Sequence, residues 1–147
     1  MPKMWILIII IVLAICSTDD LRERHINIYI LLIGEAVALA WILICHKSSF
    51  SLTGILPGII LLIYSKMTSG LGEGDAYVFI FIGTLLGAYM TMEIMITSFF
   101  MSGLYAIYLL LYKKEEKNSG FPFVPFIFIG TVLCLLINFI RKELVLL

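Results

Sequence analysis

The sequence has little charge and no excess of either sign. Only 14% of the 147 residues are charged, and ten lysines and arginines balance ten aspartates and glutamates, so the formal net charge is zero. Nothing in this balance indicates a basic surface for nucleic acid, so we expect no nucleic-acid partner. The charged residues fall mostly in short clusters between apolar runs, which is the pattern of a protein that crosses a membrane several times.

Metal-binding and thiol–disulfide motifs are also missing. Cys16, Cys45 and Cys134 lie within apolar runs or at their edges, and none of them forms a CxxC pair. We interpret them as small apolar packing residues. His25 and His46 adjoin polar segments, and neither has a second histidine at ligand spacing. We therefore expect no metal site and no cofactor.

The first apolar run lacks a cleavage site. Residues 5–16 follow Lys3 and resemble a signal peptide, but Ser17-Thr18-Asp19-Asp20 comes next instead of a small-x-small site. We expect the run to be retained as a membrane helix.

Hydrophobic residues make up 62% of the chain, which exceeds what a soluble domain of this length buries in one core. We expect an all-α membrane protein, a single domain over residues 1–147 built as a bundle of about six transmembrane helices. A very short turn around Glu93 would separate the fourth and fifth of them. The expected helices are residues 4–17, 26–45, 52–64, 75–90, 93–112 and 125–140. Several are shorter than the roughly 20 residues that cross a bilayer, which predicts local thinning of the membrane or small errors in these bounds.

The placement of lysine and arginine predicts the orientation in the membrane. With the N-terminus outside, the inner segments hold Arg22, Arg24, Lys66, Lys113, Lys114 and Lys117, and the outer segments hold Lys3, Lys47, Arg141 and Lys142. This bias favours that orientation of a multi-pass membrane protein. The polar segments around Asp20, Asp75 and residues 113–126 would then face the cytosol.

Two aspartates stand at the inner ends of expected helices, Asp20 after the first and Asp75 at the start of the fourth. Acidic side chains at membrane depth are costly and usually functional. If the helices bring the two carboxyls together, the pair would share one proton. The ionised member could activate water while the protonated member donates to a peptide carbonyl, as aspartyl proteolysis requires. The alternative is two ordinary helix-end residues near water, and Asp75 would suit a helix N-terminus.

Two further segments have unusual composition. In Gly72-Glu73-Gly74-Asp75 the glycines leave room for the close approach of an extended substrate chain. In the segment Pro122-Phe123-Val124-Pro125-Phe126 the two prolines break any helix. Its aromatic side chains would form either an interfacial belt or one wall of a cleft.

Together these elements resemble the prepilin peptidases (type IV leader peptidases), a family of GxGD membrane aspartyl proteases. The family motifs are D-x-R-x-x-x-I, seen here from Asp20 to Ile26, then GxGD at Gly72–Asp75 and PFxPF at 122–126. Glycines eight and twelve residues after the second aspartate, here Gly83 and Gly87, are also common in the family. The resemblance implies that Asp20 and Asp75 are catalytic. We further expect the substrate to contact Gly72, Gly74, Pro122, Phe123 and Pro125.

The sequence departs from the family pattern in three ways. Asn27-Ile28 follows the first motif where Pro-Asn is usual, and Tyr77 replaces a frequent lysine. The methyltransferase region of the larger bacterial members has no counterpart in this sequence, so the resemblance implies leader cleavage alone. Presenilin-like proteases share GxGD but resemble the chain less, because their PAL segment is absent.

The resulting hypothesis is a hydrolase that removes the short leader of type IV pilin-like precursors at the cytosolic face, with membrane lipid around it. The precursor could belong to a pilus, a secretion system or a competence system. The sequence does not set the oligomeric state. Asp19 is an adjacent alternative to Asp20. A second hypothesis is a small transporter or channel lined by Glu35, Glu73 and a helix broken at Pro57-Gly58. Glu35 could equally have a packing role. A third hypothesis is a non-enzymatic assembly subunit.

Overall fold

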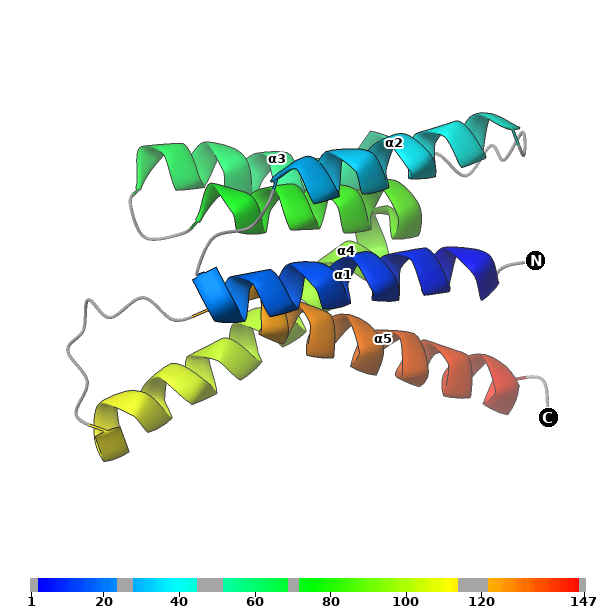
Figure 1. The fold of residues 1–147 in the computed structure, drawn as a ribbon. Coiled ribbons are helices and arrows are strands. Elements are labelled where there is room, and N and C mark those ends of the chain that lie inside the picture. The colour runs from blue at the N-terminus through cyan, green and yellow to red at the C-terminus, as the bar shows by residue number, and fades with distance from the viewer. Residues whose placement is uncertain (1–2, 24–27, 45–51, 69–71, 114–121, 146–147) are drawn as a thin grey trace.

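The computed structural model describes residues 3–23, 28–44, 52–68, 72–113 and 122–145, and nearly all of them are helical. The elements are α1 (Lys3–Glu23), α2 (Ile28–Ile44), α3 (Leu52–Met67), α4 (Glu73–Tyr108), the π-helical η1 (Leu109–Lys113) and α5 (Val124–Val145) (Figure 1). The expected all-α class is confirmed. Within these ranges, two helical stretches are long and apolar enough to cross a membrane, Glu73–Leu111 and Val124–Lys142. The expected count of six transmembrane helices is therefore not confirmed.

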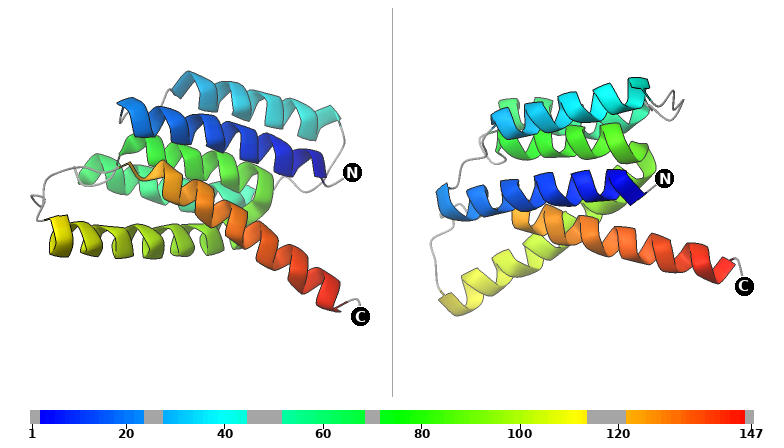
Figure 2. Two further views of the ribbon diagram at one scale, coloured as in Figure 1. Left: turned by 60° about the horizontal axis from the view of Figure 1, so that its bottom comes forward. Right: turned by 45° about the vertical axis from the view of Figure 1, so that its right-hand side comes forward.

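The longest helix, α4, is sharply bent at Gly87. This residue has φ 80° and ψ 172°, a conformation that glycine adopts without the steric cost of a side chain. The chain before the bend (the first arm, 73–86) and the chain after it (the second arm, 88–108) run in nearly opposite directions in Figures 1 and 2. The Thr91 hydroxyl donates to the Gly87 carbonyl at 2.8 Å. The expected turn around Glu93 is thus misplaced, because the chain reverses at the residue that tolerates positive φ and Glu93 lies inside the second arm.

Glycine also sets the separation of α3 from the first arm. A Cβ atom added at Gly54 would overlap the Gly83 carbonyl oxygen, and one added at Gly83 would overlap the Gly54 carbonyl. At Gly58 an added Cβ would lie 2.6 Å from the backbone nitrogen of Ile80. Small residues of this kind let helices in a membrane pack backbone against backbone.

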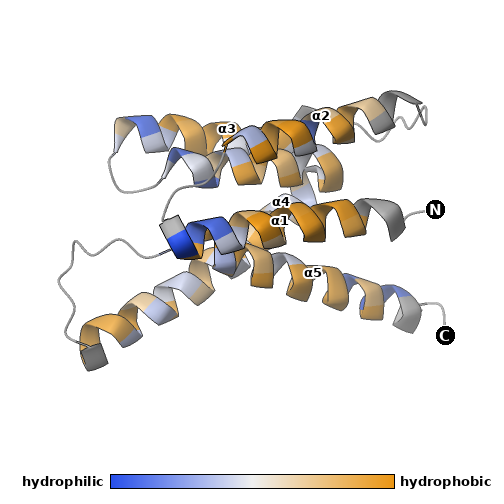
Figure 3. Cartoon of the chain, viewed as in Figure 1, coloured by the Kyte–Doolittle hydropathy of each residue, from blue (hydrophilic) through white to orange (hydrophobic). Residues whose placement is uncertain are grey.

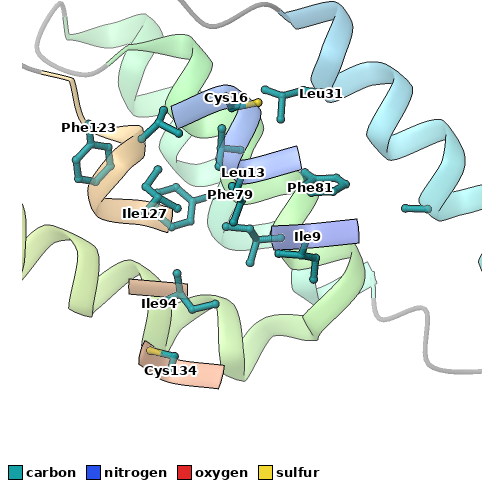
Figure 4. Packing of buried hydrophobic residues seen from close by; sticks show 14 residues of the cluster. Ile9, Leu13, Cys16, Leu31, Phe79, Phe81, Ile94, Phe123, Ile127 and Cys134 are labelled. Carbon is teal, nitrogen blue, oxygen red and sulfur yellow. The ribbon is translucent and has the colours of Figure 1, made fainter. Parts of the chain in front are cut away.

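The hydrophobic core lies where α1, both arms of α4 and α5 meet (Figure 4). Its largest fully buried side chains include Ile9, Leu13, Phe79, Ile94 and Ile127. Large apolar side chains are exposed on each of the helices α1 to α5, so much of the outer surface is hydrophobic. Hydrophobic residues occur along all of these helices in Figure 3. Such a surface suits contact with lipid, since monomeric soluble proteins rarely expose extended apolar patches.

Candidate active site

Three helix ends meet on one side of the molecule. The last turns of α1, the first turn of α4 and the start of α5 lie at the same end of the bundle in Figures 1 and 2. Asp20 is in α1 and Asp75 is in α4, and their side chains are only 7% and 9% exposed. The two carboxylates lie near enough to interact electrostatically. The structure therefore brings together two acids that are 55 positions apart in the chain (75 − 20 = 55).

The Asp20 carboxylate is held by the start of α5. The Val124 amide donates to Oδ2 of Asp20 at 3.0 Å, and the Phe123 amide also hydrogen-bonds the carboxylate. Asp20 thereby satisfies amides that a helix N-terminus otherwise leaves unpaired, at the positive end of the α5 dipole. Burial raises the pKa of the Asp20 carboxyl above its ordinary value, and the two amides oppose this rise because they favour the charged form.

Asp75 is positioned by the glycine that precedes α4. Gly72 is the N-cap residue, with φ −68° and ψ 135°, and its carbonyl accepts a hydrogen bond of 3.2 Å from the Asp75 amide. The Asp75 side chain turns back over Gly72, where an added Cβ would lie 3.2 Å from Oδ2. A glycine at this position leaves the carboxylate uncrowded. Gly72 and Glu73 are exposed, whereas Gly74 is half-buried.

The PFxPF segment enters the site mainly through its backbone. The Phe123 side chain is 9% exposed and belongs to the buried cluster (Figure 4). Its ring centroid lies 5.1 Å from that of Phe99 and 6.4 Å from that of Phe79. Pro122 and Pro125 remain half-exposed. Sequence reasoning did not foresee that the Phe123 ring is buried, because the motif alone does not show which side of the segment faces the core.

Glu35 lies away from the aspartate pair. Its Oε1 is 2.6 Å from the hydroxyl of Thr84, which is nine residues beyond Asp75, or about 13 Å along the helix axis. The Thr84 hydroxyl is also 3.0 Å from the Ile80 carbonyl. It has a single proton and cannot donate to both acceptors at once. Glu35 Oε2 is buried and has no hydrogen-bond partner among the described residues. This position favours the packing role for Glu35, as a polar link between α2 and α4.

A second polar contact joins the second arm of α4 to α5. The Asn138 side-chain amide donates to Oε2 of Glu93 at 3.0 Å and to the Cys134 carbonyl at 2.9 Å. The sequence predicts a turn at Glu93 and does not show its pairing with Asn138. The available signal was the depth of both polar residues within long apolar runs.

No group of three or more histidine, cysteine, aspartate or glutamate side chains suited to a metal occurs in the described ranges. His25, Cys45 and His46 lie outside those ranges.

A comparison with known families shows to which family the chain belongs. Residues 7–107 match the model of the type IV leader peptidase family. The chain belongs to the type IV leader peptidase family. The matched range includes Asp20, the segment Gly72–Asp75 and both Gly83 and Gly87, and it ends before the PFxPF segment. No curated protein and no solved structure gave a significant match.

Family membership confirms the resemblance that the sequence motifs indicated. Type IV leader peptidases are peptidases, so the chain is assigned to a peptidase family, and the family together with the two long apolar helices indicates a membrane protein.

Proposed function

We propose that the protein is a membrane aspartyl endopeptidase that removes the short leader of type IV pilin-like precursors. The observation on which the proposal depends is the meeting of Asp20 and Asp75, two buried acids from different helices, at one end of the bundle. Two buried carboxyls that interact electrostatically do not both ionise easily, and one proton shared by the pair is the resting state that acid–base catalysis by two carboxyls requires.

The surroundings support different roles for the two aspartates. Asp20 accepts hydrogen bonds from the amides of Phe123 and Val124, which favour its ionised form. In the proposed mechanism Asp20 is the general base that takes a proton from water as the oxygen attacks the scissile carbonyl. Asp75 is the protonated partner and donates to the carbonyl oxygen as the tetrahedral intermediate forms. Collapse of the intermediate breaks the C–N bond: Asp20 gives its proton to the leaving amine, and one hydroxyl of the intermediate returns a proton to Asp75, which restores the starting protonation of the pair.

The place of the pair supports a substrate that is cut near the membrane surface. Asp20 and Asp75 lie at helix ends, so the scissile bond would sit at the membrane surface and not at the bilayer midplane. A pilin-like precursor has a polar leader followed by a hydrophobic helix, and that helix could lie along the apolar outer faces of the protein. In the proposed orientation the site faces the cytosol in the inner membrane. The candidates for contact with the extended leader are Gly72, Gly74, Pro122 and Pro125. Phe123 would support this segment from the core.

The test is cleavage of a synthetic precursor peptide by the purified protein in proteoliposomes. The cut is mapped by mass spectrometry, with wild type beside Asp75→Asn. The proposal predicts one cut at the junction of leader and hydrophobic segment by wild type, and none by the variant. Glu73→Gln is the matched control, since Glu73 is exposed in the same turn and is expected to leave cleavage intact. Cleavage by Asp75→Asn at the wild-type rate would contradict the proposal.

A further inference from the structure

A chain of aromatic contacts joins the elements that hold the two aspartates. Phe79 lies one helical turn after Asp75 on the first arm of α4, on the same face of the helix. Its ring centroid is 6.4 Å from the rings of both Phe99 and Phe123. Phe99 belongs to the second arm, and Phe123 directly precedes α5. The three rings therefore connect both arms of α4 to the start of α5.

The same phenylalanine fixes the backbone that holds Asp20. The Phe123 carbonyl accepts hydrogen bonds from the amides of Phe126 (3.0 Å) and Ile127 (3.3 Å), which closes the first turn of α5. Next to it, the Val124 side chain is fully buried. The Phe123 and Val124 amides then point at the Asp20 carboxylate. A shift of the Phe123 ring would move these amides, because the ring and the amides belong to one short stretch of backbone.

We propose that Phe123 is a positioning residue for proteolysis, which holds the amides of residues 123 and 124 against Asp20 by packing its ring against Phe99 and Phe79. This inference rests on the proposed function, in which Asp20 is the general base. It assigns the PFxPF segment a role in placing a catalytic carboxylate. The ring itself is too deeply buried to serve as a substrate contact.

The two roles predict different kinetics. Misplacing a catalytic group by about 1 Å can reduce the rate about 100-fold, even when the substrate still binds. Loss of the Phe123 ring should therefore lower kcat and leave KM nearly unchanged, whereas loss of a substrate contact should mainly raise KM. Weaker hydrogen bonds from the two amides should also make Asp20 harder to ionise. The acid limb of the activity profile should then move to higher pH.

Few other titratable groups near Asp20 could change the pH dependence of activity. Among the described residues, the titratable groups that interact with it are Asp75 on α4 and Cys16 on α1. Asp19 is the neighbouring acid on α1 and interacts with Cys16. Phe79, Phe99 and Phe123 do not titrate, so a shifted profile in their variants reports on the aspartate pair.

The experiment compares Phe123→Ala, Phe123→Leu and Phe99→Ala in proteoliposomes, measuring kcat, KM and the pH dependence of kcat/KM with a precursor peptide. Phe99→Ala is the decisive variant, since it removes the second-arm ring that packs against Phe123 without altering the PFxPF segment. The matched control is Phe126→Leu, which changes the other phenylalanine of that segment. The Phe126 ring packs against Tyr105, with the ring centroids 5.3 Å apart, and is not one of the three rings of the cluster. Asp20→Asn is measured alongside.

We expect kcat to fall about 10- to 100-fold in Phe123→Ala and by a smaller factor in Phe99→Ala, both with an upward shift of the acid limb and nearly constant KM. The kcat of Phe123→Leu should lie between those of wild type and Phe123→Ala. This variant keeps the test valid if the alanine variant does not accumulate in the membrane. Unchanged kcat and an unchanged acid limb in Phe123→Leu and Phe99→Ala would overturn the inference, as would a rise in KM alone. Full activity of Asp20→Asn would instead overturn the proposed function, so the two failures are distinguishable.

Discussion

The backbone amide of Val124 donates a 3.0 Å hydrogen bond to the Asp20 carboxylate across 104 residues of sequence. This bond joins the end of α1 to the start of α5, at the end of the bundle where α4 begins. One carboxylate thus completes a helix N-terminus and forms half of the proposed catalytic pair. Because Asp20 is buried and must also ionise, its environment is a compromise between stability and activity.

The structure separates the two adjacent aspartates of α1. Asp20 is 7% exposed and receives the α5 amides, whereas Asp19 is half-buried on a different face of the helix, about 100° away. We expect Asp20→Asn to reduce cleavage about 10²- to 10⁴-fold, the usual range for loss of a general acid or base. Asp19→Asn should cleave at nearly the wild-type rate. The opposite order, measured by precursor processing at equal protein levels, would reassign the base to Asp19.

Removing the Asp20 charge should stabilise the protein at neutral pH. Burial raises the pKa of Asp20 in the folded state, so its contribution to stability is present at low pH and is lost as the pH rises through that raised value. Asparagine avoids this loss and still offers an oxygen to the Val124 amide. In detergent, Asp20→Asn should unfold at a higher temperature than wild type near neutral pH. The difference should shrink as the pH is lowered below the ordinary aspartate range. A variant less stable than wild type at neutral pH would contradict this reasoning.

The bend in α4 provides a matched pair of glycine substitutions. An added Cβ meets nothing within 4 Å at either Gly87 or Gly103, but Gly87 alone among the described glycines has positive φ. Gly87→Ala should therefore lose about 1–3 kcal/mol of stability through backbone strain. Gly103→Ala should be neutral or gain up to about 1 kcal/mol, since alanine favours a helix. Thermal unfolding in detergent checks both variants. Equal effects would show that α4 does not need the bend.

The link between Glu35 and Thr84 should be energetically modest. Hydrogen bonds between helices in membranes average about 0.6 kcal/mol and reach about 1.7 kcal/mol in double-mutant cycles. A cycle with Glu35→Ala and Thr84→Val, read by unfolding, should give a coupling in this range. Each single variant should retain cleavage, because the contact lies about 13 Å along α4 from Asp75. Proton or solute flux in vesicles that is abolished by Glu35→Gln would instead support the transporter hypothesis.

Features that depend on local chemistry could be predicted from the sequence. Asp20 and Asp75 interrupt or adjoin long apolar runs, and this marks them as unusual even without a family motif. The helical class follows in the same way, because a chain so apolar must satisfy its backbone polar groups internally. The end of the first helix was placed too early, at Ser17. In the structure α1 continues to Glu23, and Asp20 lies inside the helix.

Features that depend on three-dimensional register could not be predicted. The sequence predicts a reversal of the chain but places it around Glu93, because Gly87 lies in an apolar run with no adjacent polar residue to mark a turn. The burial of Phe123 and the Glu93–Asn138 contact both result from how the second arm packs on α5. That packing is set by side chains far apart in the chain.

Cleavage by Asp20→Asn, Asp75→Asn and the double variant, measured as kcat/KM with one precursor peptide in proteoliposomes, tests whether the two aspartates act as one unit. Residues that act together lose activity non-additively, since removing either disables the same step. We predict that each single variant is as inactive as the double. Losses that multiply, or substantial cleavage by either single variant in correctly folded protein, would show that the pair is not the catalytic group.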